Sequence, residues 1–307
     1  MNRMIRIGTR DSELALWQAK YVQQQLESFG CRTELVPVKS TGDLILDKPL
    51  YELGITGVFT KTLDVAMLKG EIDIAVHSMK DVPTQLPKGI VKAAVPERAN
   101  VHDLLVYKNN NEFLNNKKAL IATGSLRRKA QWLNQFPKHQ ITDLRGNVNT
   151  RLQKLEDNDW NGAIFAAAGL ERIGIKPEKS MVLDWMVPAP AQGAMMVVAK
   201  EEDTDIINAL KPLNSYETDI CTTIEREFLR TLEGGCTAPI GALATIDVDY
   251  LCFTGVLLSL DGKQKISIEK KILIEHFEGL GVICAQELLA DGGQQLMKKV
   301  RKELEKK

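Results

Sequence analysis

The sequence predicts an α/β protein with two α/β domains and a smaller α+β domain at its C-terminal end. Short apolar runs typical of strands alternate with helical patterns, which is the arrangement of βαβ units. The alternation stops at a polar stretch, residues 108–118, and then starts again. From residue 215 a helix is followed by alternating strands and a final helix, which is typical of an α+β domain. A chain of 307 residues, 44% hydrophobic, can bury two or three such cores.

The first region contains predicted strands at 6–10, 33–38 and 72–78, and predicted helices at 12–29 and 60–69. Both helices end at a glycine. In the first helix apolar residues recur on one face, and Ser12 is placed to cap the N-terminus. These features predict helices that each cover one face of a sheet.

The second region repeats this order, with strands at 119–125, 140–146 and 162–169 and helices at 126–136 and 147–156. The third region is expected to form a helix at 215–232, strands at 240–248, 251–260 and 263–274, and one long helix at 281–307. No internal sequence repeat stands out.

Composition and charge restrict the class of function. No apolar run approaches the roughly 18 residues of a membrane span, and the N-terminal residues lead into a strand pattern instead of a signal peptide. We therefore expect a cytoplasmic protein without membrane contact. Forty basic residues balance forty acidic ones, so nucleic-acid binding through overall charge is not expected. The five cysteines lack CxxC spacing and the four histidines are well separated, so neither a disulfide framework nor a metal site is indicated.

The positions of the arginines indicate an anion-binding site. Arg127 and Arg128 fall in the first turn of a predicted helix, where the helix dipole disfavours each cation by about 0.3–1 kcal/mol. A bound anion would remove this conflict. The same context, at the end of a predicted strand, recurs at Arg10, Arg145, Arg151 and Arg172. Carboxylate is favoured over phosphate because neither GxxxxGK[ST] nor GxGxxG is present.

A second group of polar side chains follows the strand predicted at 72–78. His77, Ser78, Lys80 and Asp81 crowd its C-terminal end. A lone histidine at such a place is more often structural than catalytic, and an adjacent lysine and aspartate are usually a solvated pair. No serine or cysteine nearby in sequence completes a triad with His77. The residues alone therefore leave open whether this edge is catalytic.

Cys236 follows two glycines in LEGGCTAPIG, residues 232–241, where a helical pattern ends. A cysteine on such a turn is expected to be accessible, although no histidine base lies near it in sequence. In contrast, Cys221, Cys252 and Cys284 lie in apolar patterns and are expected to be buried and inert, while Cys31 borders a turn and has no assigned role.

The motifs RIGTRDSELALWQA, FTKTLDVAM, DIAVHSMKDVP, GSLRRKAQ, LRGNVNTRL, AAGLERIG, AQGAM and LEGGCTAPIGA occur in this order over residues 5–242. With them the chain resembles the porphobilinogen deaminase (hydroxymethylbilane synthase) family. The resemblance implies two periplasmic-binding-protein-like α/β domains, with the chain returning to the first of them near residue 195, and a smaller α+β domain. The implied boundaries are 1–97 with 194–212, 98–193 and 213–307.

The resemblance also implies a reaction in tetrapyrrole (porphyrin, haem) biosynthesis. Family members join four porphobilinogen molecules head to tail into hydroxymethylbilane and release ammonia at each condensation. The primer is a dipyrromethane cofactor, tethered by a thioether to the cysteine that matches Cys236. Loss of ammonia from porphobilinogen gives an azafulvene, an electrophile that a thiol can attack without a histidine base. The family is usually monomeric, so a monomer is expected.

By motif match, Asp81 takes the catalytic role, because its carboxylate can stabilise positive charge on the pyrrole as ammonia departs. Cofactor contacts besides Cys236 are expected from Lys80, Ser78, Thr123, Ser125, Arg127, Arg128, Arg145 and Gly146. Substrate contacts are expected from Arg10, Ser12, Lys61, Arg151 and Arg172. Arginine suits this task because its planar fork binds a carboxylate through two hydrogen bonds. No metal is implied.

The chain departs from the family pattern at four positions. Thr56 replaces a usual lysine in a segment expected to act as a lid, and a hydroxyl is lost at Gly124. Ala191 and Met195 also differ, in a segment expected to pack between domains. None of these changes affects Asp81, so they bear on details of the lid and rate more than on the reaction.

Two other classes of protein stay open. A two-lobed chain with anion sites at helix ends could be a solute-binding protein, although such a protein needs no exposed cysteine. A thiol-dependent hydrolase using Cys236 would require a histidine base brought in by the fold. A dipyrromethane adduct at Cys236, seen in the intact mass, would favour the synthase over both.

Overall fold

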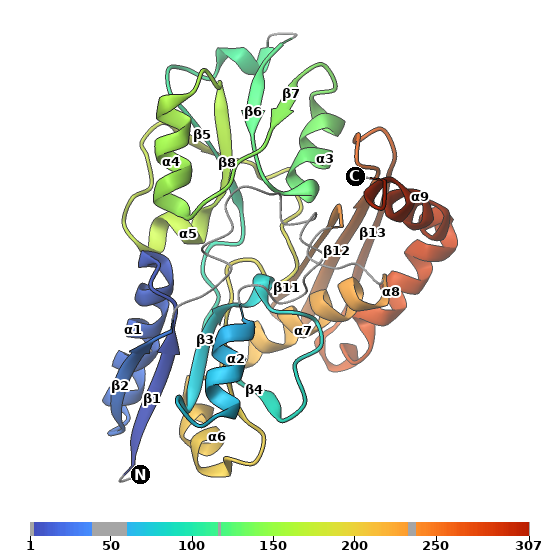
Figure 1. Ribbon diagram of the computed structural model, residues 1–307. Coiled ribbons are helices and arrows are strands. Elements are labelled where there is room, and N and C mark those ends of the chain that lie inside the picture. The colour runs from blue at the N-terminus through green and yellow to red at the C-terminus, as the bar shows by residue number, and fades with distance from the viewer. Residues whose placement is uncertain (1–2, 39–59, 116–117, 233–237, 307) are drawn as a thin grey trace. The chain divides into compact units, whose positions relative to one another are not determined.

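The computed structural model describes residues 3–38, 60–115, 118–232 and 238–306 (Figure 1). Within these residues the chain divides into two compact units. The first contains the described residues up to Ala99 together with Gly193–Asp219, and the second contains Asn100–Gln192 and the described residues from Ile220 onward.

The first unit is built on a five-stranded sheet with the order β2-β1-β3-β10-β4. Its strands are β1 (Met4–Thr9), β2 (Arg32–Pro37), β3 (Ile74–Ser78), β4 (Ile90–Ala94) and β10 (Met195–Lys200). Strands β2, β1 and β3 are parallel, and β10 is antiparallel to both of its neighbours. The segment after residue 193 therefore contributes a strand to the sheet formed by the N-terminal residues.

Three helices cover this first sheet, α1 (Glu13–Ser28), α2 (Lys61–Leu68) and α6 (Thr204–Leu210), and a 3₁₀ turn at Lys211–Leu213 follows α6. Val22 and Leu26 of α1 share one apolar cluster with Ile206 of α6, so these two helices lie on the same face. The other face receives α2, because Gly8 of β1 lacks a side chain where Leu63 of α2 packs.

The second unit also contains a five-stranded sheet, with the order β7-β6-β8-β5-β9. Its strands are β5 (Asp103–Tyr107), β6 (Leu120–Ala122), β7 (Gln140–Thr142), β8 (Gly162–Ala166) and β9 (Ser180–Val182). Three are parallel, and β5 is antiparallel to both of its neighbours. Helix α3 (Leu126–Gln135) packs on one face, while α4 (Val148–Asp157) and α5 (Ala167–Arg172) pack on the other, and a 3₁₀ turn at Glu112–Asn115 precedes β6.

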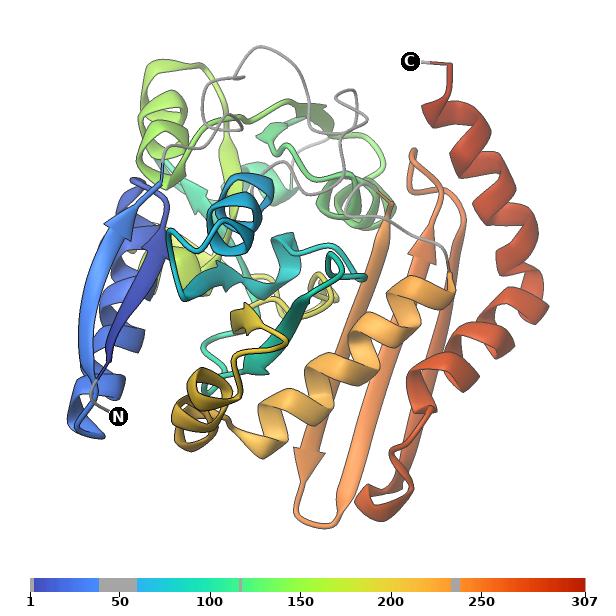
Figure 2. The ribbon, with the colours of Figure 1, turned by 60° about the horizontal axis from the view of Figure 1, so that its bottom comes forward.

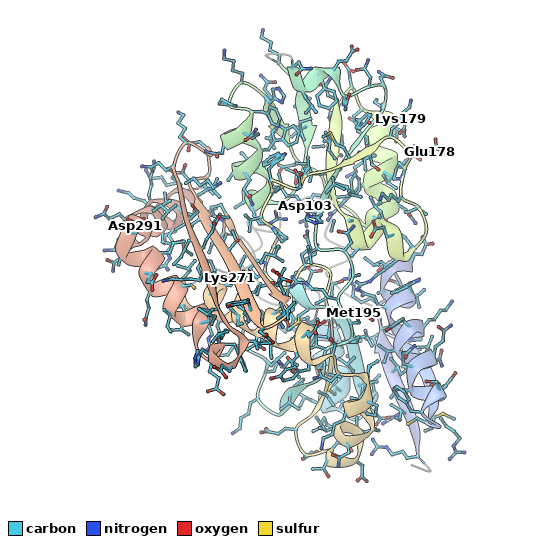
Figure 3. The ribbon with its side chains drawn as sticks, turned by 180° about the vertical axis from the view of Figure 1, so that it is seen from behind. Asp103, Glu178, Lys179, Met195, Lys271 and Asp291 are labelled. Carbon is cyan, nitrogen blue, oxygen red and sulfur yellow. The ribbon has the colours of Figure 1, made fainter. Side chains whose placement is uncertain are left out.

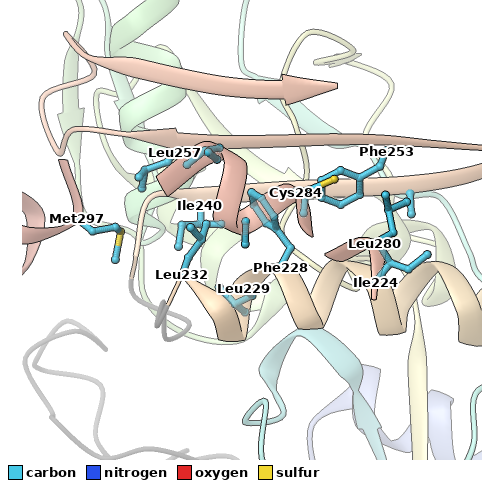
Figure 4. Packing of buried hydrophobic residues seen from close by; sticks show 14 of the residues in the cluster. Ile224, Phe228, Leu229, Leu232, Ile240, Phe253, Leu257, Leu280, Cys284 and Met297 are labelled. Atoms are coloured by element: carbon cyan, nitrogen blue, oxygen red, sulfur yellow. The ribbon is translucent and has the colours of Figure 1, made fainter. Parts of the chain in front are cut away.

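The second unit also holds an antiparallel three-stranded sheet, β11 (Ile240–Asp247), β12 (Tyr250–Leu258) and β13 (Lys265–Leu273), which a 3₁₀ turn at Ile274–His276 follows. One of its faces is covered by α7 (Tyr216–Thr231), α8 (Leu280–Leu288) and α9 (Gln294–Leu304) (Figure 2). Phe228 of α7 meets Phe253 of β12 edge to face, beside the buried Cys284 (Figure 4). Val256 and Leu258, on the opposite face, pack against Ala130 of α3.

These sheets confirm the predicted fold class of two α/β parts and a smaller α+β part. The prediction of one long helix over residues 281–307 was wrong. The structure has α8 and α9 separated by a π turn, Leu289–Gly293, in which Gly292 has a φ of +91°. Because only glycine adopts such a φ without strain, Gly292 interrupts the helix. The exact boundaries of three separate domains stay a prediction.

Candidate functional site

The first unit brings its predicted site residues to one edge of its sheet. β1 and β3 are parallel, so Arg10, just after β1, and Ser78, at the end of β3, lie at the same end of the sheet. Lys80 and Asp81 follow at once in a 3₁₀ turn, Met79–Asp81. Ser78 is held in place, because its Oγ accepts a 2.9 Å hydrogen bond from Nε2 of Gln18, a buried residue of α1. The Asp81 side chain is exposed, which suits a group that must meet a substrate.

Two substrate-binding candidates begin helices of this unit. Ser12 occupies the N-cap position of α1, as predicted, but its side chain makes no capping hydrogen bond. The predicted capping by its hydroxyl was therefore wrong, although the backbone conformation is the extended one typical of an N-cap. Lys61 is the first residue of α2 and is exposed.

His77 on β3 is a buried polar residue beside this edge. Its Nε2 atom has no hydrogen-bond partner among the described residues. Burial, assisted by the positive charge of Arg10, lowers the pKa of His77 to about 4. The imidazole is therefore neutral near pH 7.

The second unit also gathers its candidates at one edge, because β6, β7 and β8 are parallel. The loops after β6 and β7 are held together closely. The backbone N–H of Thr123 donates to the carbonyl of Thr142 at 2.9 Å. A Cβ atom on Gly124 would lie 2.6 Å from the carbonyl oxygen of Leu144, so a side chain there would push the loops apart. The same point is 3.7 Å from Cδ of Arg145, which places Arg145 against the β6 loop.

The loop that carries Arg145 contains a backbone conformation that only glycine adopts without strain. Gly146 has a φ of +116°, and its carbonyl accepts a 2.7 Å hydrogen bond from Nε of Arg151 on α4. Burial lowers the pKa of Arg145, and Asp143 opposes this effect. Nε of Arg145 is buried and has no hydrogen-bond partner among the described residues. Such a donor is suited to a ligand acceptor. Arg172 is the half-buried last residue of α5.

Helix α3 begins as predicted, with Ser125 at the N-cap accepting a 3.4 Å hydrogen bond from the N–H of Arg128. Arg127 and Arg128 lie in its first turn, where the sequence indicated an external anion. The structure shows an anion of the protein itself. Asp103, the first residue of β5, accepts a hydrogen bond of 2.7 Å from Nη1 of Arg127 and one of 2.7 Å from Nη2 of Arg128. The counter-ion that the structure shows for Arg127 and Arg128 is therefore a carboxylate of the protein itself.

These three side chains are almost completely buried. Burial alone would raise the pKa of Asp103, but the charges of Arg127 and Arg128 hold it well below its ordinary value. Two guanidinium groups and one carboxylate leave one positive charge in excess among the three. Nε of Arg127 is buried and lacks a hydrogen-bond partner among the described residues. The binding of a ligand carboxylate by these arginines stays a prediction.

Sequence reasoning did not single out Asp103. The residue lies near the start of a short apolar run, HDLLVY. An acidic residue is unusual in a strand that otherwise suits the core, and this was the signal that could have identified it. Its partners lie 24 and 25 positions away, so no local pattern connects them.

Cys236 and Thr56 lie outside the described residues. Of the other cysteines, Cys221 and Cys284 are buried as expected, whereas Cys252 and Cys31 are half-buried, and all four are free thiols. In the described ranges no three acidic, histidine or cysteine side chains are placed to hold a metal ion.

Comparison with known proteins agrees with this picture. A family model described as the porphobilinogen deaminase dipyrromethane cofactor-binding domain matches residues 5–208, and the model of the C-terminal domain of the same family matches residues 220–290. The chain is 42% identical to porphobilinogen deaminase of Desulforamulus reducens over 306 residues, covering 98% of this chain and 99% of that one. It is 40% identical to that of Pelotomaculum thermopropionicum over 312 residues, covering 99% of each.

Among solved structures, the periplasmic aliphatic sulphonate binding protein SsuA from Escherichia coli matches with a TM-score of 0.39 and 14% identity. The match covers 76% of this chain and 71% of that one.

The matches therefore define an enzyme of the transferase class with a dipyrromethane cofactor-binding domain. The chain belongs to the porphobilinogen deaminase family.

Proposed function

We propose that this chain is a hydroxymethylbilane synthase that condenses porphobilinogen on a dipyrromethane carried by Cys236. In the balanced reaction, four porphobilinogen molecules and one water give one hydroxymethylbilane and four molecules of ammonia. The observation that carries the proposal is the set of guanidinium groups at the strand ends of the second unit, where Arg145 and the Arg127–Arg128 pair are held by defined contacts.

The residues of this edge fit a ligand with several carboxylates, such as a pyrrole bearing acetate and propionate. The Nε atoms of Arg127 and Arg145 are buried donors without a partner among the described residues, which is a costly state unless an acceptor is supplied. Arg127, Arg128 and Arg145 would hold the cofactor, with Lys80, Ser78, Thr123, Ser125 and Gly146. Arg10, Ser12, Lys61, Arg151 and Arg172 would bind substrate carboxylates.

Asp81 would act on the incoming substrate. Its exposed carboxylate can accept the pyrrole N–H of porphobilinogen. As the C–N bond to the leaving ammonia breaks, positive charge spreads over the ring, and the carboxylate stabilises it more strongly than it stabilises the uncharged substrate. Lys80 lies beside Asp81 in the same 3₁₀ turn and can pair with a carboxylate of the cofactor.

Cys236 would provide the covalent attachment. Its Sγ gives up a proton and forms a thioether bond to the methylene carbon of a porphobilinogen unit, from which ammonia departs. When bound, dipyrromethane would supply the free pyrrole carbon to which the first substrate unit is joined, and each later unit would be joined to the free carbon of the unit added before it.

The proposal includes a cytoplasmic monomer that binds neither nucleic acid nor membrane. The balanced net charge supports the absence of non-specific nucleic-acid binding. In the described part of the chain, no helix is long and apolar enough to cross a membrane. Size-exclusion chromatography with light scattering tests the monomer, since a dimer would elute at twice the mass of 34.2 kDa.

The intact mass of chain purified from a porphobilinogen-making host tests the proposal directly. We expect the mass of the chain plus one dipyrromethane, a colour reaction with an aldehyde reagent for pyrroles, and loss of both in Cys236→Ser. Cys252→Ser is the matched control and should keep the adduct. An unmodified thiol in the wild-type chain, with no turnover of porphobilinogen, would instead favour a solute-binding protein or a thiol-dependent hydrolase.

A further inference from the structure

Asp103 organises the N-terminus of α3 from a different element of the second unit. It begins β5, its side chain is fully buried, and Figure 3 labels it within this unit. Its Oδ2 accepts from Nη1 of Arg127 at 2.7 Å. Its Oδ1 accepts from Nε of Arg128 at 3.0 Å, from Nη2 of Arg128 at 2.7 Å and from Nε2 of Gln192 at 3.0 Å. Both carboxylate oxygens are therefore used to fix neighbouring side chains.

Backbone carbonyls also bind each guanidinium group. Nη1 of Arg127 also donates to the carbonyl of Val187 at 2.9 Å, and Nη1 of Arg128 donates to that of Ile164 at 2.9 Å. Arg128 is held through all three of its nitrogens and Arg127 through two bonds from Nη1, so turning either group breaks charge-assisted hydrogen bonds. Arginine has many rotamers in water, so such fixation is what prepares its remaining donors for a ligand.

We infer that Asp103 is a positioning residue of the reaction, one that acts on the ligand through Arg127 and Arg128. This inference rests on the proposed function, in which the two arginines hold carboxylates of the cofactor. Asp103 does not touch the ligand. It sets the directions of the two guanidinium groups and offsets one of their two charges, so that two adjacent cations can be buried together.

A similar arrangement in the first unit offers a matched control. Asp73 is also a buried aspartate bound by two arginines. Its Oδ1 accepts from Nη2 of Arg6 at 2.8 Å and from Arg3, and its Oδ2 accepts from the N–H of Arg6 at 2.8 Å. Asp73 precedes β3, whereas the candidate residues Ser78, Lys80 and Asp81 follow the other end of that strand. Removing its charge therefore disturbs a buried ion pair without changing the directions of the candidate ligand-binding side chains.

The test compares Asp103→Asn with Asp73→Asn in the full-length chain. For each variant we would measure urea unfolding, the rate at which porphobilinogen assembles the dipyrromethane adduct on apo chain, followed by intact mass, and kcat/KM for porphobilinogen. Both variants are expected to unfold at lower urea. In Asp103→Asn, assembly and kcat/KM should also fall by about 100-fold, because misdirected binding groups cost about that much. In Asp73→Asn, both should stay within about threefold of wild type, as expected for a change away from the site.

Gln192→Leu provides a milder change, because it keeps both ion pairs and removes an amide that donates to Asp103 and, at 2.8 Å, to the carbonyl of Val101. Its assembly rate should fall by about three- to tenfold, as for the loss of the one hydrogen bond that reaches Asp103. If Asp103→Asn does not fold, this variant decides the question. Adduct assembly at the wild-type rate by folded Asp103→Asn would overturn the inference. If Asp103→Asn does not fold, assembly at the wild-type rate by Gln192→Leu would overturn it. Losses of assembly rate and kcat/KM in Asp73→Asn equal to those in Asp103→Asn would also overturn it. If wild-type chain itself formed no adduct, the proposed function would fail instead.

Discussion

The backbone N–H of Ala191 donates a hydrogen bond of 2.6 Å to Oε2 of Glu225, a fully buried carboxylate on α7. Oε1 of the same side chain accepts from the N–H of Ala244 on β11 at 2.8 Å. One side chain therefore satisfies two buried backbone donors that come from different segments of the second unit. Buried N–H groups without an acceptor are costly, so Glu225 holds these segments together.

Glu225→Gln should lower the free energy of unfolding by about 1–3 kcal/mol, because an amide nitrogen would replace one of the two acceptor oxygens and leave an N–H unsatisfied. Urea unfolding measures this loss. Glu287→Gln is the control, since Glu287 is exposed and its ion pair with Lys270 is worth at most about 1 kcal/mol. Equal losses in the two variants would contradict the assigned role of Glu225.

Ala191 itself adopts a left-handed backbone conformation, with a φ of +62°, although it is not glycine. This conformation costs an L-residue about 1–2 kcal/mol. Ala191→Gly relieves the strain but gives up a buried methyl group and adds freedom to the unfolded chain, so we expect a stability change within about 1 kcal/mol. Ala191→Val should lose about 2 kcal/mol or more, because branching worsens the strain and the site is fully buried. Thermal unfolding of both variants tests this order of stabilities. An Ala191→Val variant more stable than Ala191→Gly would contradict it.

Much of the fold could be predicted because its determinants are local. The period of apolar residues and the cap at Ser125 predicted a helix at 126–136, and α3 spans Leu126–Gln135. A strand was also predicted at 140–146, with Arg145 at its C-terminal end; the structure has β7 there, but the strand already ends at Thr142. In both α/β sheets three parallel strands are followed by an antiparallel one, although no sequence repeat is visible, because many apolar sequences fit the same strand.

Other features depend on contacts that no short stretch contains. The pairing of Asp103 with Arg127 joins a strand to a helix 24 residues away, and Gln192 reaches the same carboxylate from 89 residues away. The sequence could therefore indicate a need for an anion at α3 but not its source. Likewise, the sequence placed Ser12 at a helix start, while the geometry of its hydroxyl depended on the surrounding fold. The roles of the individual site residues stay predictions.

His77 should make stability depend on pH below neutrality. Its folded pKa of about 4 lies below the ordinary value of 6.5, so between these two values the unfolded chain binds a proton that the folded chain does not. The contribution of neutral His77 to the free energy of unfolding is complete above pH 6.5 and is lost as the pH falls through about 4. The total is about 3 kcal/mol.

The measurement is the free energy of unfolding of wild type and His77→Gln from pH 7.5 down to 4. The difference between the two curves should narrow towards low pH, because only the wild type loses the contribution of His77. Asp73, whose pKa of about 2 results from hydrogen bonds to Arg6 that outweigh its burial, titrates below this window and should not interfere. Parallel curves would exclude His77 as the titrating group.

Gly146 should not tolerate a side chain. Its φ of +116° strains any L-residue, and an added Cβ would lie 2.7 Å from Cγ2 of Thr150. Gly146→Ala should cost about 2–4 kcal/mol and move the carbonyl that Arg151 binds. Gly174→Ala is the control, because Gly174 also has a positive φ, +68°, but nothing lies within 4 Å of its Cβ position. The control should lose only about 1–2 kcal/mol. Chemical denaturation distinguishes the two, and an equal loss would mean that the Thr150 contact carries no cost.

Asp81→Asn should separate charge from shape at the proposed catalytic position. The side chain is exposed and lies in a short turn, so the variant should fold with a stability within about 0.5 kcal/mol of wild type. Turnover of porphobilinogen should fall by about 10²–10³-fold, because an amide cannot offset the positive charge that develops as ammonia departs. Asp249→Asn changes another exposed aspartate, in the turn between β11 and β12, and should keep full turnover. Steady-state release of ammonia by the three proteins at equal adduct content measures the effect. Turnover of Asp81→Asn within a few-fold of wild type would assign the stabilisation of that charge to another group.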